Sequence, residues 1–117
     1  MIARLAIAIA LIVAGNALAA EPALTAEQSK GRTLFNESCV FCHGERGHAT
    51  TLLAKRLGAD NAVLDKRTDL SVELIRRVVR HGINSMPWYR RAELSDRDLD
   101  SIAAYLTRTR SDIHIAK

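Results

Sequence analysis

Both cysteines of the chain lie within one short segment, and a histidine follows the second cysteine directly. Cys39 and Cys42 are separated by two residues, and His43 comes next. This pattern is typical of covalent c-type haem attachment. Two thiols at this spacing near a helix end reach the two vinyl-derived carbons on one edge of a porphyrin, and the next residue turns its imidazole toward the iron. The segment therefore predicts one haem c, with its iron bound by His43.

The same residues allow three other interpretations. A zinc site would need further thiolates or paired histidines at ligand spacing, and His48, His81 and His114 form no such pair. A redox-active dithiol favours a strand-then-helix setting, whereas this pair follows an expected helix. A disulfide between Cys39 and Cys42 would close a very small loop. The haem interpretation is preferred because motif, composition and export features agree.

A haem iron bound by one histidine has a second axial position, and Met86 is our candidate for it. Met86 is the only methionine after the first residue, and it lies between two expected helices in a segment that contains Gly82 and Pro87. Pro87 restricts the backbone there, so the segment does not continue as helix. A thioether in a constrained loop is a good soft ligand. A lone methionine is ordinarily core filler, and His81 is the rival ligand.

Composition indicates one small domain whose centre needs more than side chains. The chain has 117 residues, of which 48% are apolar and 26% are charged. This length excludes large scaffolds such as eight-unit βα barrels, and the composition argues against wholesale disorder. Two Phe, two Tyr and one Trp supply few rings to fill a core. A non-peptidic group would supply the missing core.

Residues 1–19 have the features of a secretory signal peptide, with cleavage after Ala19. Arg4 is their only side-chain charge, and residues 5–14 form an unbroken apolar run. Ten apolar residues make a helix of about 15 Å, too short for a hydrocarbon core of roughly 30 Å, although an uncleaved anchor is the alternative. We therefore expect a periplasmic domain over residues 20–117, with no membrane span after cleavage.

The charge of the exported domain argues against nucleic acid as a partner. The whole chain has 17 basic and 13 acidic residues, so removal of Arg4 leaves 16 against 13 and a net charge of +3. Nucleic-acid binding relies on a stronger basic surface, and export makes such a partner improbable.

Helical periodicity dominates residues 20–117, and no alternating pattern favours a strand. We expect a first helix from Thr25, which forms a capping box with Gln28, to about Ser38. Gly31 lies four residues before Phe35 on the inner face of this helix. A glycine there costs about 1 kcal/mol of helix propensity, so we expect another helix to approach closely.

A short helix is expected over residues 52–57, capped by Thr51, and a loop over residues 59–70. A further helix begins after Ser71 and ends before Gly82. Its expected inward side chains are Leu74, Ile75, Val78 and Val79, and its outward ones are Glu73, Arg76, Arg77 and Arg80.

The last helix has the best-marked start in the chain. Ser95 is its N-cap and Asp98 its third residue, while Leu94 and Leu99 are spaced as a hydrophobic staple. Asp96 and Asp98 lie in the positive first turn. We therefore predict an all-α domain of three main helices and one short helix.

The chain resembles a class I cytochrome c through a spaced series of residues, namely Gly31-x-x-x-Phe35-x-x-x-Cys39-x-x-Cys42-His43, then Met86-Pro87 and a final helix with Tyr105. The resemblance covers nearly all of residues 20–117. It implies the cytochrome c fold wrapped around one covalent haem, with the first and last helices crossing near Gly31. Residues 68–95 are also similar to cytochrome subunits of flavoprotein dehydrogenases such as p-cresol methylhydroxylase.

The chain departs from the family pattern in the residues that accept a hydrogen bond from the ligand histidine. Many members have a proline between the haem motif and the methionine. The carbonyl of that proline, or of the residue before it, accepts the Nδ1 proton of the ligand histidine. No proline lies between His43 and Met86. An imidazole ligand almost always has such an acceptor, so we expect a backbone carbonyl within residues 47–57 to orient His43.

The two axial ligands define the expected activity. With His43 and Met86 both bound, iron has no open position for a substrate, so catalysis at the metal is disfavoured. Thioether ligation raises the reduction potential relative to two histidines. We predict an electron carrier between a dehydrogenase and a downstream acceptor, and no enzyme activity. The alternatives are an enzyme or sensor with a labile sixth position, and a structural subunit whose haem only docks a larger dehydrogenase.

A cluster of arginines surrounds the expected methionine ligand. Residues 71–91 contain one acid and five arginines, a local balance of +4, and these arginines are Arg76, Arg77, Arg80, Arg90 and Arg91. They predict a basic collar that steers a redox partner with an acidic docking surface. The alternative is a solvated helix face, with some arginines pairing with haem propionates.

Overall fold

The computed structural model describes residues 23–108, so the expected signal peptide, its cleavage site and His114 lie outside the described residues. This part of the chain is helical and contains no named strand. The α-helices are α1 (Ala26–Ser38), α2 (Val40–His43), α3 (His48–Leu57), α4 (Val72–His81) and α5 (Asp96–Leu106), with short 3₁₀ turns η1 (Ala59–Asn61) and η2 (Leu64–Lys66). The predicted all-α class is confirmed. Within residues 23–108 no helix has the length and apolarity that a membrane crossing requires.

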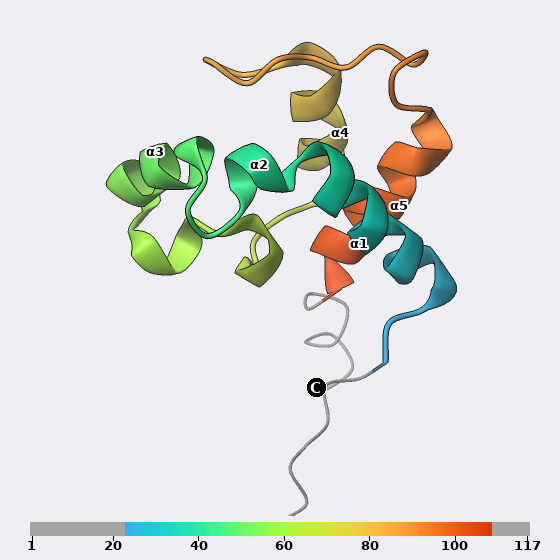
Figure 1. The fold of residues 1–117 in the computed structure, drawn as a ribbon, viewed down its shortest axis with the longest axis horizontal. Coiled ribbons are helices and arrows are strands. Elements are labelled where there is room, and N and C mark those ends of the chain that lie inside the picture. The colour runs from blue at the N-terminus through green and yellow to red at the C-terminus, as the bar shows by residue number, and fades with distance from the viewer. Residues whose placement is uncertain (1–22, 109–117) are drawn as a thin grey trace, which may run out of the picture.

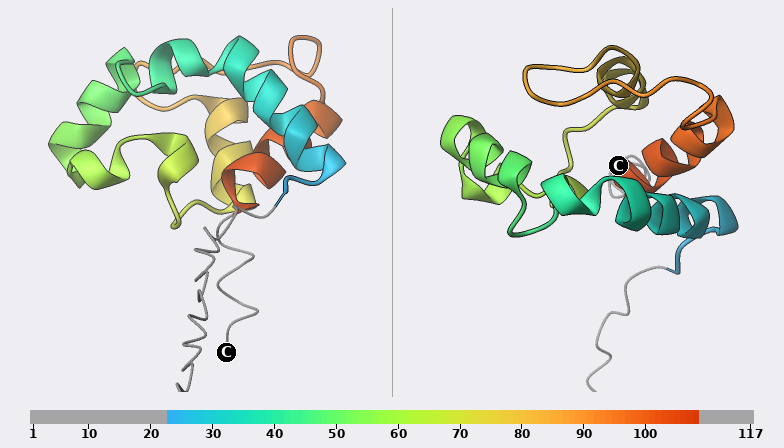
Figure 2. Two further views of the ribbon diagram at one scale, coloured as in Figure 1. Left: turned by 60° about the horizontal axis from the view of Figure 1, so that its bottom comes forward. Right: turned by 45° about the horizontal axis from the view of Figure 1, so that its top comes forward.

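Helices α1 and α5 lie side by side and form the most extensive contact in the fold (Figure 1, Figure 2). A Cβ on Gly31 would lie 1.8 Å from the carbonyl oxygen of Ser101, so only glycine allows the two backbones to approach this closely. One turn further along α1, the ring centroids of Phe35 and Tyr105 are 5.9 Å apart. The expected crossing near Gly31 is confirmed.

Polar contacts reinforce the same crossing. Ser101 is fully buried, and its hydroxyl donates to the carboxylate of Glu27 on α1. Nearby, the Nζ of Lys30 is 2.7 Å from Oδ1 of Asp98. A buried hydroxyl needs such a partner, since an unpaired one would cost free energy. The interface therefore fixes both the distance and the register of α1 against α5.

Three helix starts follow the sequence signals. Thr25 and Gln28 form the expected reciprocal capping box at α1. The Ser95 hydroxyl accepts a hydrogen bond of 3.1 Å from the amide of Asp98 at the start of α5. Ser71 caps α4 in the same way. Each hydroxyl accepts a hydrogen bond from an amide that has no partner inside its own helix. These helix starts can therefore be predicted from the sequence.

Helix α3 begins earlier than the expected residue 52, at His48, with Gly47 as its N-cap. The two threonines of its first turn account for the difference. The hydroxyl of Thr50 donates to the Gly44 carbonyl at 2.7 Å, and that of Thr51 donates to the Gly47 carbonyl at 3.2 Å. Thr51 is therefore inside the helix and does not cap it.

The hydrophobic core lies between α1, α4 and α5, and its buried members are Phe35, Leu70, Ile75, Leu94, Leu99, Ile102, Ala103, Tyr105 and Leu106. Leu74 is 44% exposed, but it lines a cavity beside the core together with Ile75, Val78 and Val79, as its predicted inward position requires. One expectation for α4 is wrong. The Arg80 side chain is only 15% exposed rather than outward, because it folds back onto carbonyl groups of the following loop. Residues 59–70, expected as a loop, contain both 3₁₀ turns.

The α1–α5 crossing generates a stability prediction for Gly31→Ala. The added methyl group must push Ser101 away, and overpacking of this kind costs about 1–3 kcal/mol. Because the methyl group would meet backbone atoms, the upper part of that range applies, about 2–3 kcal/mol. The gain in helix propensity is about 1 kcal/mol, so we expect a net loss of about 1–2 kcal/mol in the free energy of unfolding. Denaturant titration of the holoprotein measures it. Asn36→Ala, on the exposed part of the same helix, should stay within about 0.5 kcal/mol of the original protein. Equal stability of the two variants would contradict the packing account.

Candidate cofactor site

The segment with both cysteines joins α1 to α2. Cys39 is the C-cap of α1. Its amide donates to the carbonyl of Phe35 at 2.9 Å, and its own carbonyl accepts the amide of His43 at 2.9 Å. Cys39 and His43 are half-buried, Cys42 is exposed, and the two thiols are free rather than joined as a disulfide. The helical turn between the cysteines therefore fixes the backbone spacing of the two thiols and the imidazole.

The ionisation of Cys39 does not fit a redox-active dithiol. Burial, with a smaller effect from Cys42, raises the pKa of the Cys39 thiol to about 11. A redox-active cysteine needs a lowered pKa, because the thiolate is the reactive form. Burial also lowers the pKa of His43, which favours the neutral imidazole that binds metal. Within residues 23–108 no cluster of three or more His, Cys, Asp or Glu side chains could hold a metal ion.

The expected acceptor for His43 is not found. Its Nδ1 is buried and has no hydrogen-bond partner among the described residues. The carbonyl of Gly47, which begins the segment we expected to supply the acceptor, already accepts both the amide and the hydroxyl of Thr51. Most other carbonyls of that stretch belong to the helical ladder of α3. The early start of α3 is therefore the physical reason why this prediction is wrong.

Met86 lies in the loop of residues 82–95, which connects α4 to α5 across one side of the fold (Figure 1). Gly82 has φ +70°, a conformation that favours glycine, and a Cβ there would lie 2.8 Å from the carbonyl oxygen of Met86. Ile83 and Met86 exchange hydrogen bonds of 2.9 and 3.3 Å around Asn84, whose φ is +49°. This tight turn holds the backbone of Met86, whose side chain is half-buried.

Two largely apolar cavities, of about 320 and 450 Å³, meet between α2, α3 and this loop. Cys39 lines the smaller cavity and Cys42 lines the larger one. The residues that line both cavities are His43, Leu53, Arg56, Ile83 and Met86. The fold thus brings together the four side chains that the sequence singled out. The rival ligand His81 lines neither cavity, although it precedes the same loop.

The donor set and the walls suit a haem. Two thiols, a neutral imidazole and a thioether border the cavities, and the smaller cavity extends to the core residues Phe35, Leu70, Ile75, Ile102 and Leu106. Imidazole and thioether are common axial donors to haem iron, and apolar walls accommodate the macrocycle. The residues therefore fit the cofactor that the motif predicts.

Lys55 and Arg56 are cavity residues that sequence reasoning missed. Both are exposed, line the larger cavity and form no ion pair among the described residues. Arg56 follows Leu53 by three positions, so the two share one face of α3. That spacing is the only signal in the sequence, and it is usable only once α3 is known to face the cavity.

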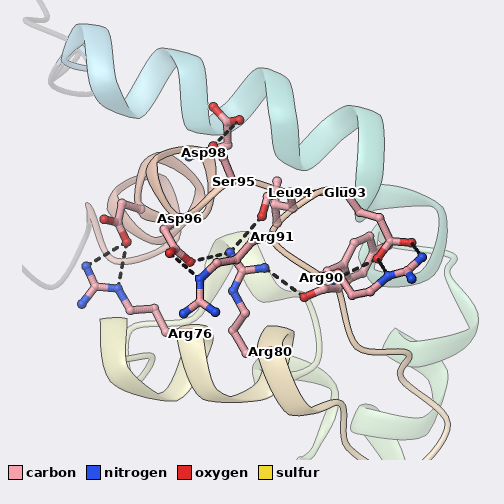
Figure 3. A network of polar contacts seen from close by, with 11 residues as sticks. Arg76, Arg80, Arg90, Arg91, Glu93, Leu94, Ser95, Asp96 and Asp98 are labelled. Atoms are coloured by element: carbon pink, nitrogen blue, oxygen red, sulfur yellow. Dashed lines mark hydrogen bonds and ion pairs between the residues drawn. The ribbon is translucent and has the colours of Figure 1, made fainter.

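The predicted basic collar is largely neutralised (Figure 3). The balance of +4 covers residues 71–91 alone, whereas the acids that pair with these arginines come later in the chain. The ion pairs are Arg76–Asp100, Arg80–Asp96, Arg90–Glu93 and Arg91–Asp96, at N–O distances of 2.8, 2.7, 3.3 and 2.7 Å. The counted balance of +4 is therefore not the charge of this surface.

Comparison with known proteins agrees with the site. Residues 26–106 match the family described as cytochrome c oxidase, cbb3-type, subunit III. The chain is 33% identical over 81 residues to a cytochrome c6 of Cyanidioschyzon merolae (strain NIES-3377 / 10D), an alignment that covers 69% of this chain and 73% of that protein. No solved structure matches the chain. The motif, the helical fold and these matches together assign the chain to the class I c-type cytochromes, which bind covalently attached haem c and transfer electrons rather than act as enzymes.

Proposed function

We propose that Cys39 and Cys42 would hold the haem through two thioethers, and that His43 and Met86 would bind its iron. One observation carries the proposal: His43 and Met86, far apart in sequence, line the same two cavities. The haem supplies one-electron redox chemistry when it is bound. His43 contributes a neutral nitrogen donor and Met86 a soft sulfur donor, so both axial positions are filled by the protein.

The surrounding residues tune and protect the site. Leu53 and Ile83 add apolar wall to both cavities, which limits water and favours the less charged ferrous iron. The hydrogen-bonded turn between Ile83 and Met86 holds the backbone that carries the thioether. His43 Nδ1 lacks an acceptor among the described residues, which makes its imidazole a weaker donor than one bonded to a carbonyl.

The absorption spectrum of ferric holoprotein tests this ligand set. We expect the far-red sulfur-to-iron band in the original protein and its complete loss in Met86→Ala, because residues 20–117 contain no other methionine. His81→Ala is the matched control, since His81 adjoins the same loop but lines neither cavity, and it should keep the band. A band that survives Met86→Ala would overturn the assignment. The pyridine haemochrome of the same sample tests the two thioether links.

We also propose that the electron donor is a dehydrogenase with an acidic docking surface. The neutralised arginines do not support this, but exposed Lys55 and Arg56 border the larger cavity without an ion pair among the described residues. Apolar side chains on the segments that carry the cysteines and Met86 are also exposed, Phe41 by 91% and Trp88 by 58%. Cations steer an acidic partner, and exposed apolar groups then bury area in the complex.

Reaction with hexacyanoferrate(III), a trivalent anion, tests the charge at this site. The rate of oxidation of the reduced protein should fall with ionic strength, and the double variant Lys55→Gln/Arg56→Gln should weaken that dependence by about half. Arg32→Gln/Arg97→Gln removes the same charge from exposed positions on α1 and α5 that line neither cavity, so its dependence should match the original protein. Equal ionic-strength slopes in the two double variants would exclude local steering.

Finally, we propose that residues 1–19 are a signal peptide and that residues 20–117 act in the periplasm. The support is the apolar run with one charge before the small-residue site. Covalent haem attachment then follows export. When the full chain is expressed in a bacterium with a haem-attachment apparatus, the mass of the coloured product should correspond to a chain starting at Ala20 plus one haem. A coloured product that retains residues 1–19 would favour the membrane-anchor alternative.

A further inference from the structure

Arg80 is a largely buried cation that holds the loop carrying Met86 (Figure 3). It extends from the last turn of α4 toward residues 82–95. Its Nη1 donates to the carbonyl of Tyr89 at 2.9 Å. Its Nη2 donates to the carbonyl of Leu94 at 2.9 Å and to the carboxylate of Asp96 at 2.7 Å. One side chain thus reaches the middle of the loop, its end and the first residue of α5.

These contacts limit the freedom of Met86. The amide of Tyr89 donates to the carbonyl of Val79 at 2.8 Å, so α4 binds both backbone polar groups of Tyr89, one directly and one through Arg80. On the N-terminal side of Met86, its backbone is bound to that of Ile83 by the two hydrogen bonds of the turn. Only two residues separate Met86 from Tyr89. The methionine therefore lies between two fixed residues, Ile83 and Tyr89, and Arg80 helps to hold Tyr89.

The contacts of Arg80 require a guanidinium group. A planar fork of N–H donors reaches two carbonyls and one carboxylate in fixed directions, whereas an ammonium group is a single point of charge. Loss of the fork leaves the carbonyls of Tyr89 and Leu94 without this donor. An acceptor left unpaired in a partly buried place is costly, so the loop would move to expose it to water. Such movement also shifts Met86.

We propose that Arg80 is a positioning residue that keeps Met86 on the haem iron. The inference rests on the proposed Met86 ligation and extends it, because it assigns control of the sixth position to a side chain that does not line either cavity. It also explains why this arginine lies inward although its helix position predicts exposure. Without the Arg80 contacts the loop would hold the thioether less firmly, and an external ligand would compete with Met86 more readily.

Arg80→Gln tests the inference in the holoprotein. We expect carbon monoxide to bind the ferrous variant about tenfold faster, as a lost charged hydrogen bond predicts, and the backbone amides of Met86 and Tyr89 to exchange faster with deuterium. The ferric far-red band should disappear at a lower temperature than the helical circular dichroism signal. In the original protein the temperatures at which the two signals are lost should differ less. These measurements report the loop separately from global stability.

Two control variants remove neighbouring ion pairs but leave the hydrogen bonds to the carbonyls of Tyr89 and Leu94 in place. Arg91→Gln removes the other cation bound to Asp96, and Arg76→Gln removes the pair that links α4 to α5 through Asp100. Both should bind carbon monoxide at the original rate. If they accelerate binding as much as Arg80→Gln does, general loss of charge is responsible and the inference is wrong.

The outcomes separate this inference from the proposed ligand set. A far-red band absent from the original protein would refute the Met86 ligation itself. A band that is present, with unchanged carbon monoxide binding in Arg80→Gln, would refute only the positioning role. Arg80→Lys serves if Arg80→Gln does not fold, because it keeps the charge but not the fork. We expect it to bind carbon monoxide faster than the original protein, and an equal rate would overturn the inference.

Discussion

The packing of α1 against α5 is the contact on which the rest of the structure depends. The carbonyl of Ser101 occupies the space that a side chain on Gly31 would need, so the two backbones approach more closely than ordinary side chains permit. Helix α1 ends at Ser38, directly before Cys39, and α5 begins where the loop with Met86 ends. The crossing therefore sets the positions of both sides of the cofactor cavity. A change in its register would move the thiols and the methionine relative to each other.

The two sides of that cavity are held by different means. On one side His43 lies in a helical turn continuous with α1, so ordinary backbone hydrogen bonds fix it. On the other side Met86 lies in a loop of fourteen residues without a helix, numbered 82–95. Its order comes from a tight turn, from α4, and from the hydroxyl of Tyr89, which reaches the carbonyl of Ser38 at 3.4 Å. The histidine side is fixed locally, whereas the methionine side depends on tertiary contacts.

Charge in this protein acts mainly between elements. Acids at the start of α5 both stabilise its positive end and bind cations from α1, α4 and the loop, as the pairs of Asp96 and Asp98 show. The bonds to Arg91 and then Arg80 lower the pKa of Asp96, so its carboxylate keeps its charge to a lower pH than a free aspartate does. Exposed ion pairs of this kind contribute little stability each. Arg80 differs because its charge is mostly removed from water and shared among three acceptors.

The sequence by itself determined the features that depend on neighbouring residues. The cysteine–histidine spacing, the caps at Thr25, Ser71 and Ser95, and the need for a close contact at Gly31 are all local, because each rests on atoms within about one helical turn. The tertiary structure decided what no local pattern encodes. It determined which face of α3 meets the cavity, which acids neutralise the arginines, and that His43 finds no carbonyl. It also turned Arg80 inward, since its acceptors lie up to sixteen residues further along the chain. Those outcomes depend on distances between elements, and the chain sets such distances only when α1 and α5 have packed.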